Sequence, residues 1–260
     1  MGDDAPGPRT MPPAAATLAL LLAAPECGLP DLSPRRPWSP GETLAFDVDV
    51  MGVVQAGTLQ LRVEPPILGG AQIPLRALVK NTSVFAKVRR VKGSAASFVE
   101  AATLRPRRYR DDVDQDGVRR TTDTSFERGS PTVRMAWTSG DQRGTIDFER
   151  RQEVLDAVSA LYYLRAAELA PGQEICFDLL ANRRYWRLRG SVARKADRVD
   201  TAAGSFTALR LDARLTRADD PSAVRPLHLW IADDRRRLLV AIVSEVDLGP
   251  VRALLSRAPE

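Results

Sequence analysis

The sequence predicts a mainly β protein, in which a curled antiparallel sheet forms an open barrel or β-roll with one amphipathic helix on its concave side. Three observations lead to this prediction. The C-terminal third alternates short apolar segments with turn residues, as antiparallel strands joined by short loops do. A similar series of alternating segments precedes it, and only one segment has helical periodicity. So long a sheet must curl or split, because open twisted sheets rarely exceed about ten strands.

The first strands follow Gly41. In Glu42–Met51 the apolar residues at positions 44, 46, 48 and 50 alternate with smaller or polar ones, which is the pattern of a half-buried strand. Ala56–Glu64 repeats this alternation and ends at two prolines. One helical turn is expected within Asn81–Ala86. Further strands are expected at Ile73–Lys80, Val88–Val91, Ala95–Leu104, Thr121–Phe126, Thr132–Trp137 and Thr145–Phe148.

The helix is predicted at Arg151–Ala167. Val158, Leu161 and Tyr162 belong to an apolar stripe with spacings of three and four residues. A single amphipathic helix in a β-rich chain is expected to cover the concave face of the sheet with this stripe. The strands after the helix are expected at Glu174–Leu180, Tyr185–Val192, Ser205–Leu215, Leu227–Ala232 and Leu238–Val246.

The N-terminus indicates export. Ala14–Ala24 is an apolar run of 11 residues, too short to span a bilayer but suited to the core of a signal peptide. Arg9 is the only basic side chain before it, and a start at Met11 would remove the two acidic residues there. We expect a signal peptide (1–24), a proline-rich linker (25–40) and a single β-rich domain (41–256), in a periplasmic or otherwise exported protein. The alternative for the apolar run is a buried or disordered N-terminal helix.

Cys27 and Cys176 are the only cysteines. An even pair in an exported protein favours a disulfide bond. Such a bond would tie the N-terminal tail to the sheet and close a loop of about 150 residues, for which chain entropy predicts a stabilisation of about 4–5 kcal/mol. Two unrelated thiols are the alternative, as is lipidation of Cys27, although Ala24-Pro25-Glu26 is a poor approach to a lipid-modified cysteine.

The charge pattern does not indicate a nucleic-acid-binding protein. Lys and Arg number 38 against 33 Asp and Glu, a net charge of +5, and the two signs are interleaved along the chain. Nucleic-acid binders usually concentrate basic residues on one face, among aromatic side chains. Only Arg183–Arg187 has this character, and we interpret it as the outward residues of a solvated strand. We therefore expect no nucleic-acid partner, and the oligomeric state is left open.

One acidic segment partly fits a calcium-binding loop. Asp112, Asp114 and Asp116 alternate before Gly117, and Asp123 stands at the twelfth position. However, Asp replaces the usual bidentate Glu, a basic residue stands at the ninth position, and neither flank is helical. The favoured interpretation is a β-hairpin turn in which Asp116-Gly117 adopts positive φ angles.

No catalytic constellation is evident. His228 is the only histidine, which excludes a cluster of several histidines, and its position beside Trp230 on a strand favours packing. Asp233 and Asp234 cannot act as paired carboxylates on a strand, where adjacent residues face opposite ways, so a turn is the better interpretation. We therefore expect a protein that is not an enzyme and has no cofactor or metal.

Several short motifs, in this order, resemble the bacterial family of domain of unknown function 3108. The resemblance covers about Gly41 to Leu255. It implies an exported, mostly antiparallel β protein, and because the family has no established activity it implies no functional residues. Leu238-Leu239 departs from the family, which tends to place a proline there. The motifs are Gly41–Leu44, Ala56–Leu59, Ser159–Arg165, Pro171-Gly172, Gly204–Leu211 and Leu229–Asp234.

Two functions are compatible with these features. The first is a non-catalytic envelope protein that binds a lipid, a glycolipid or a lipoprotein segment in a groove of the curled sheet. The second is a structural or assembly factor that binds another envelope protein through an exposed sheet edge. The first function requires a concave face lined by accessible apolar side chains. The second is favoured if core side chains fill the concave face.

Overall fold

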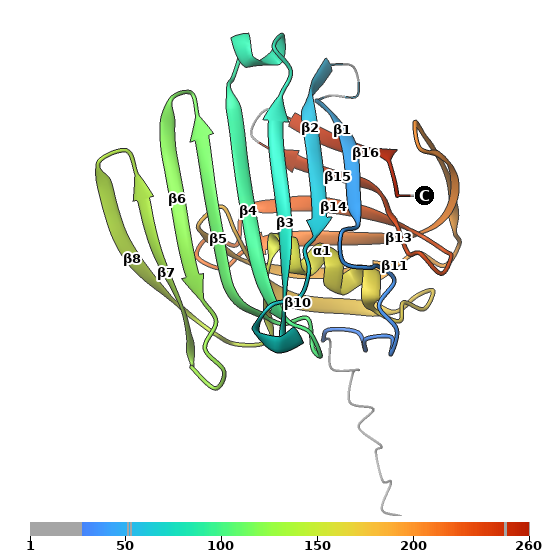
Figure 1. The fold of residues 1–260 in the computed structure, drawn as a ribbon, viewed down its shortest axis with the longest axis horizontal. Coiled ribbons are helices and arrows are strands. Elements are labelled where there is room, and N and C mark those ends of the chain that lie inside the picture. The colour runs from blue at the N-terminus through green and yellow to red at the C-terminus, as the bar shows by residue number, and fades with distance from the viewer. Residues whose placement is uncertain (1–27, 51, 53, 247–248, 260) are drawn as a thin grey trace, which may run out of the picture.

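The computed structural model describes residues 28–50, 52, 54–246 and 249–259. These residues form one sheet of sixteen strands and a single α-helix, with two short 3-10 helices, η1 (Leu68–Gly70) and η2 (Phe85–Lys87) (Figure 1). The first eight strands are β1 (Thr43–Val50), β2 (Val54–Val63), β3 (Gln72–Asn81), β4 (Val91–Glu100), β5 (Pro106–Gln115), β6 (Val118–Ser125), β7 (Thr132–Ser139) and β8 (Gln142–Glu149).

The second half of the sheet begins with β9 (Val154–Asp156), which directly precedes the helix, α1 (Ala157–Ala166), and the other strands follow the helix. These strands are β10 (Glu174–Ala181), β11 (Arg184–Val192), β12 (Asp197–Thr201), β13 (Gly204–Arg217), β14 (Val224–Ala232), β15 (Leu239–Val246) and β16 (Gly249–Arg257). Neighbouring strands are antiparallel except β9 and β10, which are parallel.

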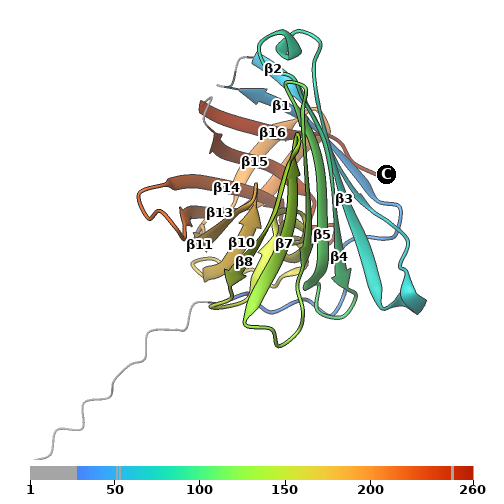
Figure 2. The same cartoon turned by 90° about the vertical axis from the view of Figure 1, so that its left-hand side faces the viewer.

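The two halves join where β1 pairs with β16. The order runs β8-β7-β6-β5-β4-β3-β2-β1-β16-β15-β14-β13-β11-β10-β9, with β12 beside β13. Strands β8 and β9 lie at opposite ends of this order and do not pair, so the sheet is curled but not closed. In Figure 1, β1–β8 run steeply in front of β10–β16, with α1 behind β2 and β3, and Figure 2 shows the two halves of the sheet facing each other. The helix contacts strands of both halves. The predicted open, barrel-like antiparallel sheet is confirmed.

One face of the sheet supplies the core. The register places Phe46 of β1 opposite Leu59 of β2 and Leu255 of β16, so the alternating apolar residues of three strands share the concave face. Phe46 and Leu255 are fully buried, as is Leu75 further along the sheet. The buried side chains of both halves and of α1 form one continuous cluster. The apolar residues that alternate with polar ones along each strand thus face the same side of the sheet and form a single apolar interior.

The helix is shorter than the predicted Arg151–Ala167. It begins after Asp156, whose carboxylate accepts hydrogen bonds from the backbone N–H groups of Val158 and Ser159, both at 2.9 Å. The Ser159 hydroxyl accepts one from the Asp156 N–H in return, which completes a capping box. The residues just before it form β9, where Leu155 pairs with Leu179 of β10. The apolar stripe fits a helix and a buried strand equally well, and the cap decides where the helix starts.

Two strand predictions are wrong. Val88 belongs to the end of η2, not to a strand, and β4 begins only at Val91. Strand β4 also ends at Glu100, short of the predicted Leu104, because the chain turns there and Leu104 adopts a positive φ of 54° while its side chain is fully buried. The predicted helical turn within Asn81–Ala86 occurs slightly later, as η2.

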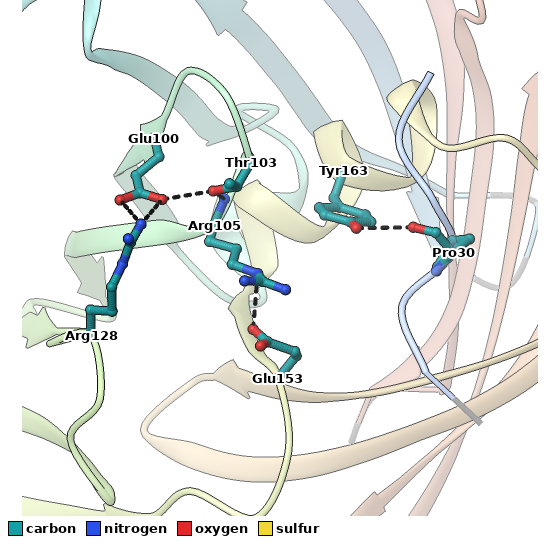
Figure 3. Close-up of polar contacts among 7 residues, drawn as sticks. All are labelled: Pro30, Glu100, Thr103, Arg105, Arg128, Glu153 and Tyr163. Atoms are coloured by element: carbon teal, nitrogen blue, oxygen red, sulfur yellow. Dashed lines mark hydrogen bonds and ion pairs between the residues drawn. The ribbon is translucent and has the colours of Figure 1, made fainter. Parts of the chain in front are cut away.

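The segment predicted as a linker packs along the helix. The Tyr163 hydroxyl donates a hydrogen bond of 2.9 Å to the carbonyl oxygen of Pro30 (Figure 3). Trp38 is buried and meets Tyr162 edge to face, with ring centroids 5.2 Å apart. On the neighbouring loop, Arg105 forms an exposed ion pair with Glu153 at 3.1 Å, which links this loop to the segment before β9. One end of the concave face is therefore sealed by α1 and the N-terminal segment together.

Candidate functional site

The helix leaves part of the concave face uncovered. Beyond its N-terminal half remains a groove with a volume of about 360 Å³. We call it the concave groove. Strands β2 to β5 form its floor, and Val158 and Leu161 of α1 form one wall. Its other apolar lining residues include Leu59, Leu61, Ala77, Val79, Ala95 and Val113.

Small side chains keep this groove open. Ala77 of β3 lies opposite Ala95 of β4, and Val79 lies opposite Gly93. A Cβ added to Gly93 would come within 3.0 Å of the Val113 side chain, so larger residues do not fit here without movement. Further along the same strands, fully buried Leu75 and Val99 fill the corresponding space. Side-chain size therefore separates the open part of the concave face from its packed part.

A few polar groups stand among the apolar walls. Arg120 and Thr122 of β6 and Asp111 of β5 line the groove. The Arg120 Nε and the Thr122 hydroxyl are buried without a hydrogen-bond partner, and burial raises the pKa of the Asp111 carboxyl. Apolar walls with a few inward polar groups are typical of small-molecule sites. This part of the concave face is lined by accessible apolar side chains, and Val79 is 40% exposed.

A second, larger groove adjoins the first. Its volume is about 920 Å³, and its lining combines Ile146 and Phe148 of β8 with basic residues of β11 and β13. We call it the arginine groove. Arg183 lines both grooves. Among the described residues, seven arginines and two carboxylates, Glu149 and Asp219, line this groove; the arginines are Arg151, Arg183, Arg184, Arg187, Arg189, Arg214 and Arg217.

The basic run Arg183–Arg187 is not simply the solvated face of a strand, as the sequence suggested. Tyr185 and Trp186 are buried, and Tyr185 stacks on Phe148 with ring centroids 5.7 Å apart. Burial raises the pKa of the Tyr185 phenol, and its hydroxyl donates a hydrogen bond of 2.9 Å to Asp178. Tyr185 thus anchors the β10–β11 hairpin against β8 and positions the arginines along the groove.

The acidic segment at 112–123 is a hairpin. Asp116 and Gly117 both have positive φ angles, 54° and 84°, as the favoured interpretation predicted. Asp112 pairs with Arg119, Asp123 pairs with Arg108 and Arg110, and Asp114 accepts a hydrogen bond from the Gly117 N–H. Within the described part of the chain, no three His, Cys, Asp or Glu side chains converge as a metal site. The carboxylates that would coordinate calcium in such a loop instead form ion pairs with arginines or accept hydrogen bonds from turn N–H groups.

The lone histidine lies away from both grooves. His228 Nδ1 is 2.6 Å from an oxygen of Asp212 on the neighbouring strand, and its ring lies beside Trp230, as the sequence suggested. Burial opposes ionisation of Asp212, but hydrogen bonds with His228 and Arg210 outweigh it and lower the pKa of this carboxyl. Asp234 accepts hydrogen bonds from the N–H groups of Arg236 and Arg237, so the Asp233-Asp234 pair forms a turn.

The predicted disulfide involves Cys27, which lies outside the described residues. Cys176 is buried on β10. Its backbone N–H donates a hydrogen bond of 3.2 Å to the carbonyl oxygen of Gly28, the residue after Cys27. The Cys27–Cys176 bond stays a prediction. The signal peptide (1–24) also lies outside the described residues, and no helix among the described ones combines the length and apolar composition needed to cross a bilayer.

Comparison with known proteins identifies a matching family and a solved structure with a similar fold. A family model described as protein of unknown function (DUF3108) matches residues 45–256. The solved structure of a β-barrel-like protein of domain of unknown function DUF1849 from Brucella abortus superimposes with a TM-score of 0.57 at 10% identity, over 85% of this chain and 97% of that one. This likeness supports a barrel-like fold.

Two further solved structures are more distant. A putative exported protein with a YmcC-like fold from Bacteroides fragilis has a TM-score of 0.33 at 8% identity and covers 90% of this chain and 100% of its own. A putative lipoprotein from Parabacteroides distasonis has a TM-score of 0.34 at 7% identity, over 85% and 96% of the two chains. No curated protein is significantly similar to this chain.

Proposed function

The chain belongs to the family described as protein of unknown function (DUF3108), and from that premise we propose that it is a non-catalytic protein of the cell envelope that binds a lipid. The apolar chain of a lipid, a glycolipid or a lipoprotein segment lies in the concave groove. Export follows the predicted signal peptide at 1–24. The protein shields an acyl chain from water and needs no cofactor to do so.

The observation that carries this proposal is the hollow in the concave face. Its volume of about 360 Å³ falls within the range of about 300–1,000 Å³ that is usual for ligand sites. Ala77, Ala95 and Gly93 occupy adjacent strands at positions where larger apolar residues would close the core. Apolar surface left open in this way lowers the stability of the protein unless an apolar ligand covers it.

The absence of a reactive constellation in the grooves supports a binding role. The lone His228 is held by Asp212 on a strand away from both grooves. Asp111 in the concave groove has a pKa raised by burial and suits hydrogen bonding to a ligand. Among the described residues that line the two grooves there is no histidine or cysteine, so neither groove contains a Ser–His or Cys–His pair of the kind used in covalent catalysis.

A second function has one observation in its favour. Strand β8 lies at one end of the strand order, so over its eight residues, Gln142–Glu149, one backbone edge has no partner strand among the described residues. An exposed edge can accept an extended segment of another protein by β-augmentation. In that case the protein is an assembly factor, and the concave groove is incidental.

Lipid-targeted mass spectrometry of the protein purified from its own envelope distinguishes the two functions. We expect stoichiometric lipid on the unaltered protein and on the variant Leu78→Phe, which changes the outer face of β3. Ala77→Phe fills the concave groove from the adjacent position of the same strand and should carry no lipid. Absence of lipid together with a co-purifying envelope protein would favour the assembly role instead. Intact-mass spectra of the same preparation give the mature N-terminus and, with and without reductant, the state of Cys27 and Cys176.

A further inference from the structure

The arginine groove contains more positive charge than its own carboxylates neutralise. Seven arginines face two acidic residues among the described residues that line it. Arg217 pairs with Asp219 at 2.7 Å and Arg151 pairs with Glu149 at 2.9 Å, so both acidic residues already have partners. Arg184, Arg189 and Arg214 make no ion pair within the described part of the chain. The groove therefore holds an uncompensated positive field.

Two of these arginines oppose each other directly. Arg189 of β11 is the cross-strand partner of Arg214 on β13. Like charges at directly opposite positions of a sheet are destabilising. Arg62 of β2 and Arg76 of β3 also lie directly opposite each other, but there Arg76 pairs with Glu64 at 2.7 Å, whereas Arg189 and Arg214 have no ion pair among the described residues. An anion that contacts both Arg189 and Arg214 would turn the repulsion into attraction.

A third arginine has unused donor capacity. The Nε of Arg187 lies 3.5 Å from Asp178 but is buried without a hydrogen bond. The Asp178 oxygens already accept hydrogen bonds from Gln152 at 2.7 Å and from Tyr185 at 2.9 Å. Its register places Arg187 opposite Thr216, one position along the face from Arg189 and Arg214. Three guanidinium groups with free donors thus lie on one side of two paired strands.

The hairpin that presents Arg183 is strained at that residue. The two-residue loop between β10 and β11 is Asn182-Arg183, with φ angles of 49° and 56°. Such turns favour Asn-Gly, because the second residue has no Cβ to clash in the left-handed region. An arginine there costs about 1–2 kcal/mol relative to glycine. Its side chain lies over the Trp137 ring at 5.0 Å and lines both grooves. The strained turn therefore presents a cation at the junction of the two grooves.

We propose that the arginine groove binds a phosphate group, and that the lipid held in the concave groove is anchored there by a phosphorylated head group. The second part rests on the proposed function. A guanidinium presents a planar fork of N–H donors that matches phosphate oxygens in pairs. A phosphate monoester has three acceptor oxygens and nearly two negative charges, which suits several arginines that converge on one site. Arg183 at the junction places the head group beside the apolar chain.

Isothermal titration calorimetry with defined probes tests this proposal. The full mature chain is titrated with dihexanoyl phosphatidic acid and with dihexanoyl phosphatidylcholine, each as dispersed monomers, and with inorganic pyrophosphate. We expect phosphatidic acid to bind at least about tenfold more tightly than phosphatidylcholine, since charge-assisted hydrogen bonds are worth about 1.5–3 kcal/mol each. The double variant Arg189→Gln/Arg214→Gln should lose this preference. The control Arg76→Gln/Arg134→Gln removes the same charge from outward-facing pairs and should keep it.

Arg183→Gly should change stability and ligand affinity in opposite directions, which would not occur if Arg183 had a purely structural role. We expect the variant to unfold at a higher denaturant concentration, because the turn is relieved, while phosphatidic acid binds about tenfold more weakly. Equal affinity of all variants for phosphatidic acid, or equal affinity of the unaltered protein for both lipids, would overturn the anchoring of a lipid head group in the arginine groove and leave the apolar groove intact.

The probes also separate the two sources of phosphate. Pyrophosphate binding that depends on Arg189 and Arg214 supports the phosphate site, whether or not a lipid binds. If Ala77→Phe weakens phosphatidic acid but not pyrophosphate, the head group and the acyl chain occupy the two grooves as proposed. If pyrophosphate binds and neither lipid binds, the phosphate site stands and the lipid function fails. If neither pyrophosphate nor phosphatidic acid binds, the phosphate proposal is wrong.

Discussion

The concave face of this protein has a packed part and an open part, built on the same strands. In the packed part, α1 places Tyr162 and Arg165 in a fully buried environment, and Arg165 pairs with Glu42 at 2.6 Å beneath Trp38. In the open part, small residues such as Ala77 and Ala95 line the concave groove. The sheet alone does not determine which part of the concave face is packed with side chains. Side-chain volume and the length of the ten-residue helix determine it.

The two parts also treat charge in opposite ways. The packed part buries one complete ion pair, and the Arg165 guanidinium also donates a hydrogen bond of 2.9 Å to the carbonyl oxygen of Arg237. The arginine groove beside the open part exposes several cations that have no partner among the described residues. A paired buried charge contributes to the structure, whereas unpaired exposed charge of one sign is available to a ligand.

The largest contrast should come from removing one arginine in each part. Arg165→Ala leaves Glu42 as an uncompensated buried charge, so we expect the free energy of unfolding to fall by about 3–5 kcal/mol. Arg189→Ala relieves the repulsion with Arg214 and should change stability by no more than about 0.5 kcal/mol, and not downward. Urea unfolding followed by tryptophan fluorescence measures both changes.

If Arg165→Ala does not fold, the double variant Arg165→Met/Glu42→Leu keeps the comparison testable. Apolar replacements of a buried pair are often close to neutral, so the double variant should fold and regain most of the lost stability. Similar losses for Arg165→Ala and Arg189→Ala would show that the two parts do not differ as described.

Truncating apolar side chains should give the next largest contrast. Leu44 is fully buried in the packed part, and Leu44→Ala should lower the free energy of unfolding by about 2–5 kcal/mol through lost burial and a residual cavity. Val79 is 40% exposed in the concave groove, so Val79→Ala should cost no more than about 0.5 kcal/mol. Urea midpoints at equal m-value provide the measurement. A large loss for Val79→Ala would mean that the groove is closed by packing.

The helix cap should have an intermediate effect with a pH signature. Burial raises the pKa of the Asp156 carboxyl, even though Ser97 donates a hydrogen bond of 2.5 Å to it. The contribution of Asp156 to stability is therefore greatest below the ordinary carboxyl pKa and declines as the pH rises through its raised value. Asp156→Asn keeps the cap and removes the titration. Over this window, unfolding free energies should fall with pH more steeply for the unaltered protein than for the variant.

Asp156→Ala removes the cap itself and should cost about 0.5–2 kcal/mol. An outward carboxylate provides the matched control, since Asp147 lies exposed on β8 and pairs only with exposed Arg134. Asp147→Ala should have little effect. Parallel pH curves for the unaltered protein and Asp156→Asn would contradict the assignment of the raised pKa.

The smallest effect is expected at the acidic hairpin. A hydrogen bond from Arg108 is the largest of the influences that lower the pKa of Asp123. This contribution is present above the ordinary carboxyl pKa and is lost as the pH falls through the lowered value. Because both partners are partly exposed, Asp123→Asn should cost no more than about 1 kcal/mol, and less at high salt.

Calcium should not change the melting temperature, and a calcium-dependent rise would revive the calcium-loop interpretation.

Much of the sheet could be predicted from sequence because alternation is a local signal. Strands with clear apolar alternation, such as Thr43–Val50, match their predicted positions closely. The strand β12 (Asp197–Thr201) was missed because its residues are mostly polar and no buried face reveals its period. The start of α1 was missed because Val154 and Leu155 fit both a helix and a strand.

The candidate site could not be predicted in the same way, because it depends on register. Ala77 and Ala95 face each other, as do Arg189 and Arg214, only once the strands pair. The one local signal was the basic and aromatic run at Arg183–Arg187, whose Asn-Arg turn departs from the favoured Asn-Gly. Its aromatic residues proved to be buried anchors and its arginines part of a groove.

A titration with a fluorescent fatty acid tests the central claim that the open part of the concave face holds an apolar chain. The unaltered protein and Leu78→Phe, which changes the outer face, should bind cis-parinaric acid at a single site with similar affinity. Ala77→Phe fills the concave groove and should bind at least about tenfold more weakly, a loss of about 1.4 kcal/mol. Equal binding by Ala77→Phe and Leu78→Phe, or no binding by the unaltered protein, would contradict the account.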